Sequence, residues 1–128
     1  MSVEVAVRDY LRSQESVMSL LNNDEARLNM DFRGNLNATH VTLYQGGGGI
    51  HPYLPLQLPT IVLHCFGSTR AAAADLAAAV ADAVRNLHEG HKPLASGEVL
   101  SVLYLPTPDG VSRYVVTTSV VAKMALAA

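Results

Sequence analysis

Two parts of the chain repeat apolar residues at intervals of three and four, which is the spacing of an amphipathic helix. The first helix is predicted over residues 3–21, with charged side chains on its opposite face. The second is predicted over residues 69–88, with Ser68 or Thr69 as its cap and Gly90 as its end. Its many alanines would let it approach a sheet closely. The apolar positions are Val3, Val7, Tyr10, Leu11, Val17, Met18 and Leu21 in the first helix, and Leu76, Val80, Val84 and Leu87 in the second.

Five other stretches have the alternation or the composition of β-strands. Leu28, Met30 and Phe32 alternate with polar residues, as in a strand with one buried face. The sequence TIVLHCF is a short, continuous apolar run, which is typical of a central strand buried on both faces. The predicted strands are residues 28–33, 39–45, 60–66, 99–105 and 112–123.

The order of these elements is helix, two to three strands, helix and two strands, which predicts an α+β fold. We expect an antiparallel or mixed β-sheet with two helices packed on one face. A length of 128 residues suits a single domain over residues 1–128, and no internal repeat or linker divides it.

Residues 44–59, YQGGGGIHPYLPLQLP, place four glycines and three prolines between two predicted strands. A phosphate-binding loop needs a Lys and a Ser or Thr after its glycines, and a dinucleotide fingerprint needs its glycines to open a helix. Here Ile50, His51 and Pro52 follow the glycines, and the prolines prevent a helix. We interpret the segment as a long connection between strands, flexible at Gly46–Gly49 and extended after them.

Composition narrows the classes of protein to which the chain can belong. Charged residues make up 16% of the chain, against roughly 25% in a typical soluble domain, so we expect other subunits to cover part of the surface. A formal net charge of −2, with scattered basic residues, argues against a nucleic-acid reader. A single cysteine excludes a disulfide framework, the charged N-terminal stretch does not suit a signal peptide, and no apolar run could span a membrane. We expect the chain to fold in a cytoplasm.

The residues able to bind a metal form no recognised constellation. His88 and His91 are three apart, but the glycine between them would break the helix that could align their rings. His64 and Cys65 are neighbours in a predicted strand, so their side chains point to opposite faces and cannot chelate together. One of the two is expected in the core and the other partly exposed. We predict no metal site.

The search for catalytic groups gives a similar result. His40 and His51 are expected in turns or loops, without ligand partners at a recognisable spacing. Cys65 could act as a nucleophile only if the fold brought a histidine close to it, and a buried structural cysteine is the commoner case. We predict no enzyme and no cofactor. The alternative, a small ligand-binding enzyme domain, would require His51, His64 and Cys65 to converge on one pocket.

Residues 58–87 carry a resemblance to a known family. A proline-led strand, LPTIVLHCFGSTR, runs into the alanine-rich helix AAAADLAAAVADAVRNL, and the long strand SRYVVTTSVVAK follows near the end of the chain. This arrangement resembles the tail terminator, or tail completion, proteins of long-tailed bacteriophages, particularly those of actinobacterial hosts. The order of elements agrees over nearly the whole chain. The matching positions are Pro59, Gly67, Thr69, Arg70, Ala73, Leu76, Ala77, Ala79 and Val80.

The resemblance implies a structural role in a virion, with the host cytoplasm as the place of assembly. Proteins of this family form a ring, usually a hexamer, on the head-proximal end of the tail tube, and they stop tube growth. The implied partners are further copies of the chain, the tail tube protein and a head-completion or connector protein. DNA would pass through the lumen without specific binding, which suits the negative net charge, and no membrane is involved. The alternative within this class is a head-closure or tail-tube protein, because these are similar in fold.

The resemblance makes the segment 44–59 a candidate for contacts between molecules. A ring is built from contacts between two different patches, and a monomer rarely exposes several apolar residues on one loop. We expect the segment to contact the adjacent subunit or the tail tube, and the alternative is an arm folded over its own sheet. The candidate interface residues are Gly46, Gly47, Gly48, Gly49, Ile50, His51, Tyr53, Leu54 and Leu56.

Overall fold

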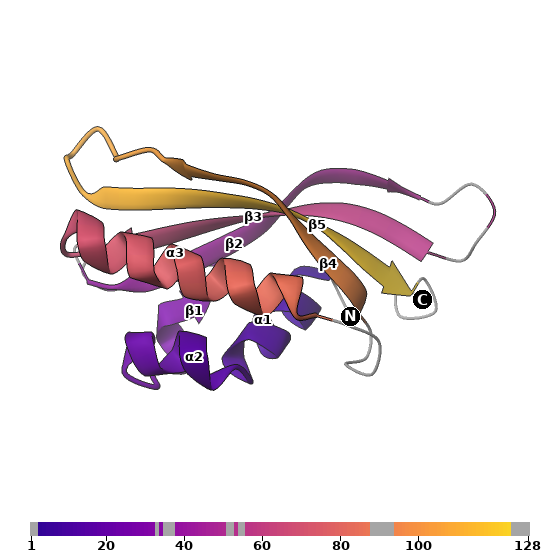
Figure 1. The fold of residues 1–128 in the computed structure, drawn as a ribbon, viewed down its shortest axis with the longest axis horizontal. Helices are drawn as coiled ribbons and strands as arrows, with labels where there is room; N and C mark the ends of the chain where they lie inside the picture. Colours follow the sequence, from indigo (N-terminus) through magenta and orange to yellow (C-terminus); the bar gives the residue numbers. More distant parts are fainter. Residues whose placement is uncertain are drawn as a thin grey trace.

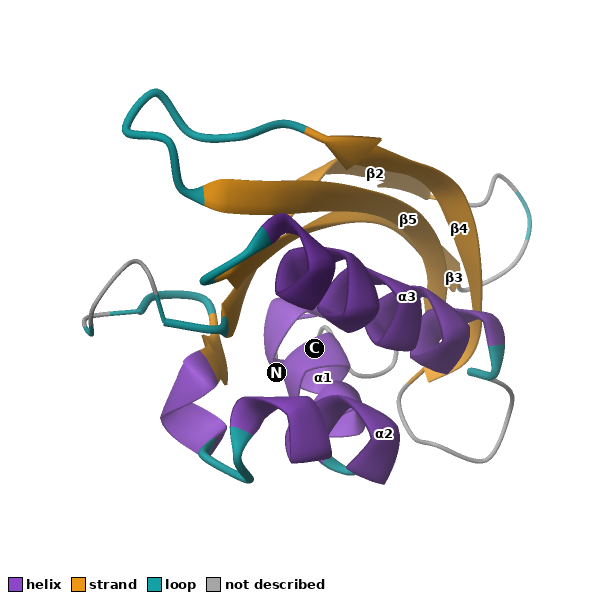
Figure 2. Ribbon diagram, turned by 60° about the vertical axis from the view of Figure 1, so that its left-hand side comes forward, coloured by secondary structure: helices purple, strands orange, loops and turns teal. Residues whose placement is uncertain are grey.

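The computed structural model describes residues 3–32, 34, 38–50, 53, 56–87 and 94–123. A twisted five-stranded sheet forms one layer, and the helices form a second layer on one of its faces (Figures 1 and 2). None of the described helices is long and apolar enough to cross a membrane. The elements are α1 (Val3–Arg12), α2 (Glu15–Met18), the 3₁₀ turns η1 (Ser19–Leu21) and η2 (Glu25–Arg27), β1 (Leu28–Asn29), β2 (His40–Ile50), β3 (Leu56–Gly67), α3 (Arg70–Arg85), β4 (Leu94–Tyr104) and β5 (Ser112–Lys123).

The strands lie in the order β1-β2-β3-β5-β4. The short β1 runs parallel to β2 and the other neighbours are antiparallel, so the sheet is mixed. At its centre Leu63 of β3 pairs with Leu43 of β2 on one side and with Val116 of β5 on the other, and all three side chains are fully buried. The predicted α+β class, with helices on one face of the sheet, is confirmed.

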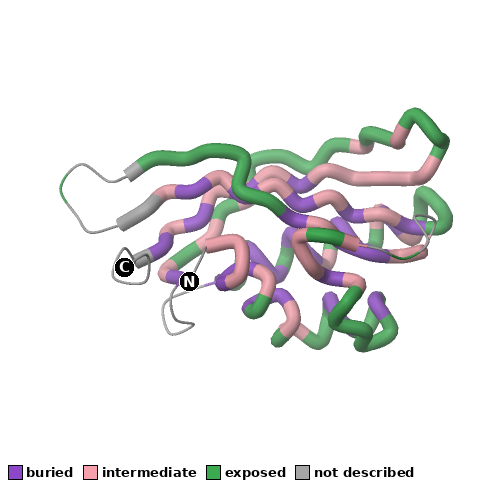
Figure 3. The backbone as a smooth tube through the Cα atoms, turned by 180° about the vertical axis from the view of Figure 1, so that it is seen from behind, coloured by how far each residue is buried: buried purple, intermediate pink, exposed green. Residues whose placement is uncertain are grey.

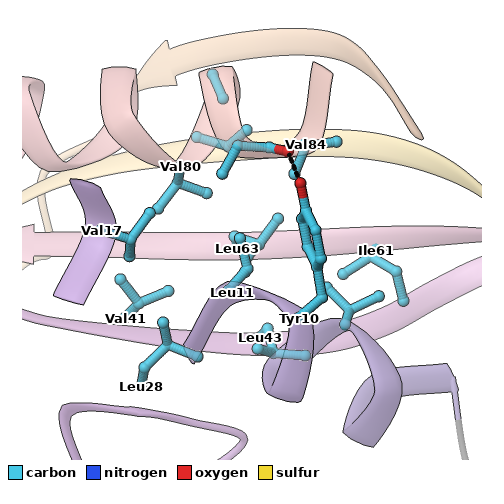
Figure 4. Packing of buried hydrophobic residues seen from close by; sticks show 14 of the residues in the cluster. Tyr10, Leu11, Val17, Leu28, Val41, Leu43, Ile61, Leu63, Val80 and Val84 are labelled. Atoms are coloured by element: carbon cyan, nitrogen blue, oxygen red, sulfur yellow. Dashed lines mark hydrogen bonds between the residues drawn. The ribbon is translucent and has the colours of Figure 1, made fainter. Parts of the chain in front are cut away.

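The hydrophobic core fills the space between that face of the sheet and the helices. Figure 4 shows Leu11 of α1, Val17 of α2 and Val80 of α3 directed towards the strand residues. Tyr10 adds a polar link, since its hydroxyl donates a hydrogen bond of 2.6 Å to the carbonyl oxygen of Ala83. The buried strand residues of this core are Leu28, Val41, Leu43, Ile61, Leu63, Cys65, Leu94, Val116, Val120 and Ala122.

The helix α3 lies close to the sheet, as its alanine content predicts. The hydroxyl of Thr69 caps it by accepting the N–H of Ala72 at 3.1 Å. At Gly67 a Cβ would lie 2.5 Å from the backbone nitrogen of Ala73, so only glycine permits this approach. The helix ends at Arg85, earlier than predicted, and the expected stop signal Gly90 lies outside the described residues.

The first predicted helix and the first predicted strand are both interrupted. After Arg12 the helix breaks, because Gln14 takes an extended conformation (φ −92°, ψ 111°), and α2 then starts a new axis. The strand predicted over residues 28–33 is confined to two residues, Leu28 and Asn29. The strands β2, β3 and β4 are longer than predicted, and β5 has the bounds that the sequence predicts.

Candidate assembly surfaces

Residues 44–50 and 56–59 of the glycine and proline segment belong to the sheet, where we predicted a long connection. The strand β2 continues through the glycines to Ile50, and β3 begins at Leu56. Backbone pairing joins Gly48 to Pro59 and Gly49 to Leu58, after a bulge between Gln45 and Gly48. The low strand propensity of glycine is overridden here by pairing with β3. This β2–β3 hairpin prolongs the sheet beyond the helix layer (Figure 1).

The structure describes only some of the predicted interface residues. Gly46, Gly47, Gly48 and Gly49 are exposed along β2, and Tyr53, between the two strands, is 91% exposed. The backbones of Ile50 and Leu56 lie in β2 and β3, and their side chains are outside the description. His51 and Leu54 lie outside the described residues. Contact of these residues with another subunit stays a prediction.

An exposed apolar surface lies at the C-terminal end of β4, where we predicted a strand but no exposed surface. We call Leu100, Val102, Leu103 and Leu105 the β4 strip, with exposed fractions of 53%, 46%, 56% and 46%. The strand β4 is at the edge of the sheet, with β5 as its one neighbour among the described strands. The signal in the sequence is the run VLSVLYL, which is apolar at both odd and even positions and therefore on both faces of its strand.

The face of the sheet opposite the helices, here called the open face, carries a row of rings. His40 stacks between Phe32 and Phe66, at centroid distances of 3.9 and 4.4 Å, and Tyr44 lies 5.6 Å from His64. The prediction that His40 lies in a turn or loop is wrong, because it opens β2 and is buried by the two phenylalanine rings. Burial lowers the pKa of His40, and also that of His64. Both imidazoles are therefore neutral at neutral pH.

The residues of the enzyme alternative do not come together in the part of the chain that the structure describes. Cys65 lies on the core face, fully buried, and burial raises its pKa to about 12, so its thiol is not a nucleophile at neutral pH. His64 lies on the open face, as predicted from strand geometry. Within the described residues no three His, Cys, Asp or Glu side chains are grouped to hold a metal ion.

A cavity of about 640 Å³ lies beside η2 and β1, and neither Cys65 nor His64 lines it. Its polar lining includes Asp24, Arg27, Asn29 and Asp31. Arg27 and Asp24 form an ion pair, with the Nε of Arg27 3.5 Å from Oδ2 of Asp24. Asp24 also accepts the backbone N–H of Ala26 as the cap of η2. These contacts stabilise the turn that leads into β1.

Comparison by sequence finds no matching family model and no matching curated protein. Comparison by structure finds a chain of the "Virion of native gene transfer agent (GTA) particle". The match has a TM-score of 0.73 at 18% identity and covers 95% of each chain. The two chains share a fold. The likeness includes the helix layer and the sheet, because it spans nearly the full length of both.

Proposed function

We propose that the protein is a structural component of a phage-like virion and acts as its tail terminator. It forms a ring, usually of six copies, on the head-proximal end of the tail tube, stops the addition of tube subunits and offers a surface to the head-completion protein. The observation that carries the proposal is the fold shared over 95% of both chains with a chain of a virion particle. The motif in residues 58–87 supports the narrower assignment.

Two features of the surface support assembly into a ring. The exposed glycine segment of β2 and the β4 strip lie at different places on the sheet, and a ring needs two different patches on each subunit. Figure 3 shows these two stretches as exposed, towards opposite ends of the sheet. The interface includes the segment that spans Gly46, Gly47, Gly48, Gly49, Ile50, His51, Tyr53, Leu54 and Leu56.

The small number of cations on the open face supports the proposal that this face lines a lumen through which DNA slides. Among the side chains that the structure describes, this face carries one cation, Arg113, which lies 6.0 Å from the ring centre of Phe66. Each phosphate neutralised by a bound cation adds salt-dependent affinity, so a surface with few cations holds DNA weakly. A head-closure protein or a tail-tube subunit is the alternative, since both would use a similar fold.

The test is the assembly state of the purified protein. Light scattering after size-exclusion chromatography, over a range of concentrations, is followed by negative-stain imaging alone and with tail tubes of the same particle. Closed rings, or caps at one end of the tubes, are expected. Open tubes formed by the protein alone would favour a tube subunit. A monomer that binds no tube would overturn the proposal.

A further inference from the structure

The two edges of the sheet are protected to different degrees. On the β2 side, β1 pairs with Val41 and Thr42, and the Glu4 carboxylate of α1 accepts the backbone N–H of Gln45 at 2.8 Å. On the opposite side, β4 (Leu94–Tyr104) has a neighbour only in β5, and its outer edge has no strand partner in the described structure. This strand has no proline and a single charge. Bulges interrupt its pairing with β5 between Leu94 and Ser96 and between Val99 and Ser101, but Ser101–Tyr104 is regular. A regular edge without charge or proline pairs readily with another strand.

The apolar side chains of the β4 edge project on both faces of the sheet. Val102 lies opposite Val116, which faces the core, and Leu103 lies opposite Val115, on the open face. A helix or loop docked on the sheet would cover only one of these faces. A strand added at the edge places its own side chains alternately on both faces and so covers both. The pattern therefore favours strand addition.

After Gln45 the outer edge of β2 has no strand partner among the described residues, and four of the five residues there are glycines. Gly47 has φ +129°, and a Cβ on Gly48 would lie 2.4 Å from the Cα of Pro59, so both are needed within the subunit. Gly49 has neither constraint, since no described atom lies within 4 Å of its Cβ position and its φ is not in the left-handed region. A strand glycine without an internal reason marks a place where another backbone approaches closely.

We propose that in the assembled ring the β4 edge of one copy, at Leu100–Tyr104, pairs as a strand with Gly46–Gly49 of β2 in the neighbouring copy. The inference rests on the proposed ring. One surface is rich in apolar side chains and the other has none, so the pair is complementary and joins two different patches. The β4 strip lies near the β4–β5 turn and the glycines near the opposite end of the sheet (Figures 1 and 3). Neighbours would therefore be offset along the strands, as closure of a sheet into a cylinder requires.

The direct test is a photo-cross-link from β4. The protein carries p-benzoylphenylalanine in place of Leu103 and is assembled as a mixture of unlabelled and ¹⁵N-labelled copies. Tandem mass spectrometry of the cross-linked peptides separates contacts between copies from contacts within one copy. We expect cross-links between copies at residues 45–50, in the assembled fraction only. Cross-links from β4 to β4 of another copy, or to any other segment, would overturn the pairing.

Two variants test the pairing through assembly. Leu103→Lys introduces a charge at the β4 edge, and Leu20→Lys is its control, because Leu20 is 41% exposed in η1. Gly49→Lys introduces a charge at the β2 edge, on the other side of the proposed pair, and Ala78→Lys is its control at an exposed position of α3. We expect Leu103→Lys and Gly49→Lys each to raise the concentration needed for assembly about tenfold or more, while the controls assemble as the wild type does.

The outcomes separate this inference from the proposed function. If the wild type forms neither rings nor caps on tubes, the proposed function fails. If the wild type assembles and the two edge variants, with melting temperatures close to that of the wild type, assemble equally well, only the strand pairing fails. The cross-link gives an answer even where a variant does not fold.

Discussion

Replacing Tyr10 by Phe tests whether α1 completes the C-terminus of α3. The hydroxyl of Tyr10 donates to the carbonyl oxygen of Ala83 at 2.6 Å, in a buried position (Figure 4). Ala83 lies in the last turn of α3, where carbonyl groups lack the usual donor four residues on. The N–H of Leu87 donates to the carbonyl of Val84 instead, at 3.1 Å. Tyr10 thus satisfies an acceptor that the helix leaves open.

The expected loss of stability can be worked out from this contact. Phe keeps the ring and its packing, so the change removes the hydrogen bond and leaves a buried carbonyl without this donor. Such a loss costs about 1–3 kcal/mol. A protein of this length should melt about 3–5 °C lower for each kcal/mol lost. Tyr44→Phe is the control, since Tyr44 is 47% exposed on the open face and should change the free energy of unfolding by less than about 0.5 kcal/mol.

The pH dependence of the stability of Tyr10→Phe gives a second measurement. Burial raises the pKa of Tyr10, so above about pH 10 the unfolded chain releases this proton before the folded chain does. The folded state then binds more protons, and stability falls as pH rises through the raised pKa. Urea denaturation followed by circular dichroism should show a shallower loss above pH 10 for Tyr10→Phe than for the wild type. An unchanged urea midpoint at pH 7, or an equal loss in Tyr44→Phe, would refute the reasoning.

Three further predictions concern single positions. Gly97→Ala should destabilise the fold by about 1–3 kcal/mol in urea denaturation, because its Cβ would lie 2.8 Å from the carbonyl oxygen of Val84; an unaltered midpoint would show that α3 can shift freely. Cys65, with a pKa of about 12, should react with iodoacetamide at pH 8 only as fast as the protein unfolds, and rapid labelling of the native protein would contradict its burial. His64→Phe should keep at least wild-type stability at pH 7, because it removes a buried Nε2 without a hydrogen-bond partner among the described residues. The lowered pKa of His64 makes the unfolded chain the stronger proton binder below about pH 6.5, so the variant should lose less stability than the wild type on acidification; equal slopes would contradict this.

The elements that the sequence predicts best are those with local signals. The strand β5 alternates between core and open face along its length, and its predicted bounds, 112–123, are those of the structure. The start of α3 was predictable from Thr69, whose hydroxyl accepts the N–H of Ala72. In both cases the deciding contacts lie within a few residues of one another or follow from strand period, so spacing alone is sufficient.

The elements that were predicted poorly depend on contacts between distant residues. The short β1 is held by α1, since Arg12 donates from Nε to the Leu28 carbonyl at 3.0 Å and Arg8 donates to the Asn29 side chain at 3.2 Å. Periodicity within residues 3–21 cannot show that these arginines turn back on the following segment. The apolar spacing also continues across the break at Gln14, because α2 packs on the same core as α1.

The glycine segment was predictable as an unusual backbone but not as part of a strand. The accumulation of glycines indicates a special backbone, and the structure places them in a strand because β3 supplies the pairing partners. Glycine alone favours a loop, so the result depends on the partner strand, which composition does not reveal. The β4 strip was missed for a related reason. An apolar run is assigned to the core by default, and only the strand order places this one at an edge.

The strand bounds show in which part of the chain charged residues are scarce. The alanine-rich α3 could account for 16% charged residues, but this helix carries Arg70, Asp75, Asp82 and Arg85 on its surface. The deficit lies in the sheet, where β2 and β3 contain no charged residue at all. A sheet with one face free of helices would ordinarily place charges there for solubility. Apart from Arg113 and Glu98, the described part of the open face is occupied by threonine, serine, aliphatic residues and stacked rings. Such a face tolerates neighbours of either charge, and it suits a protein whose sheet adjoins other molecules for most of its existence.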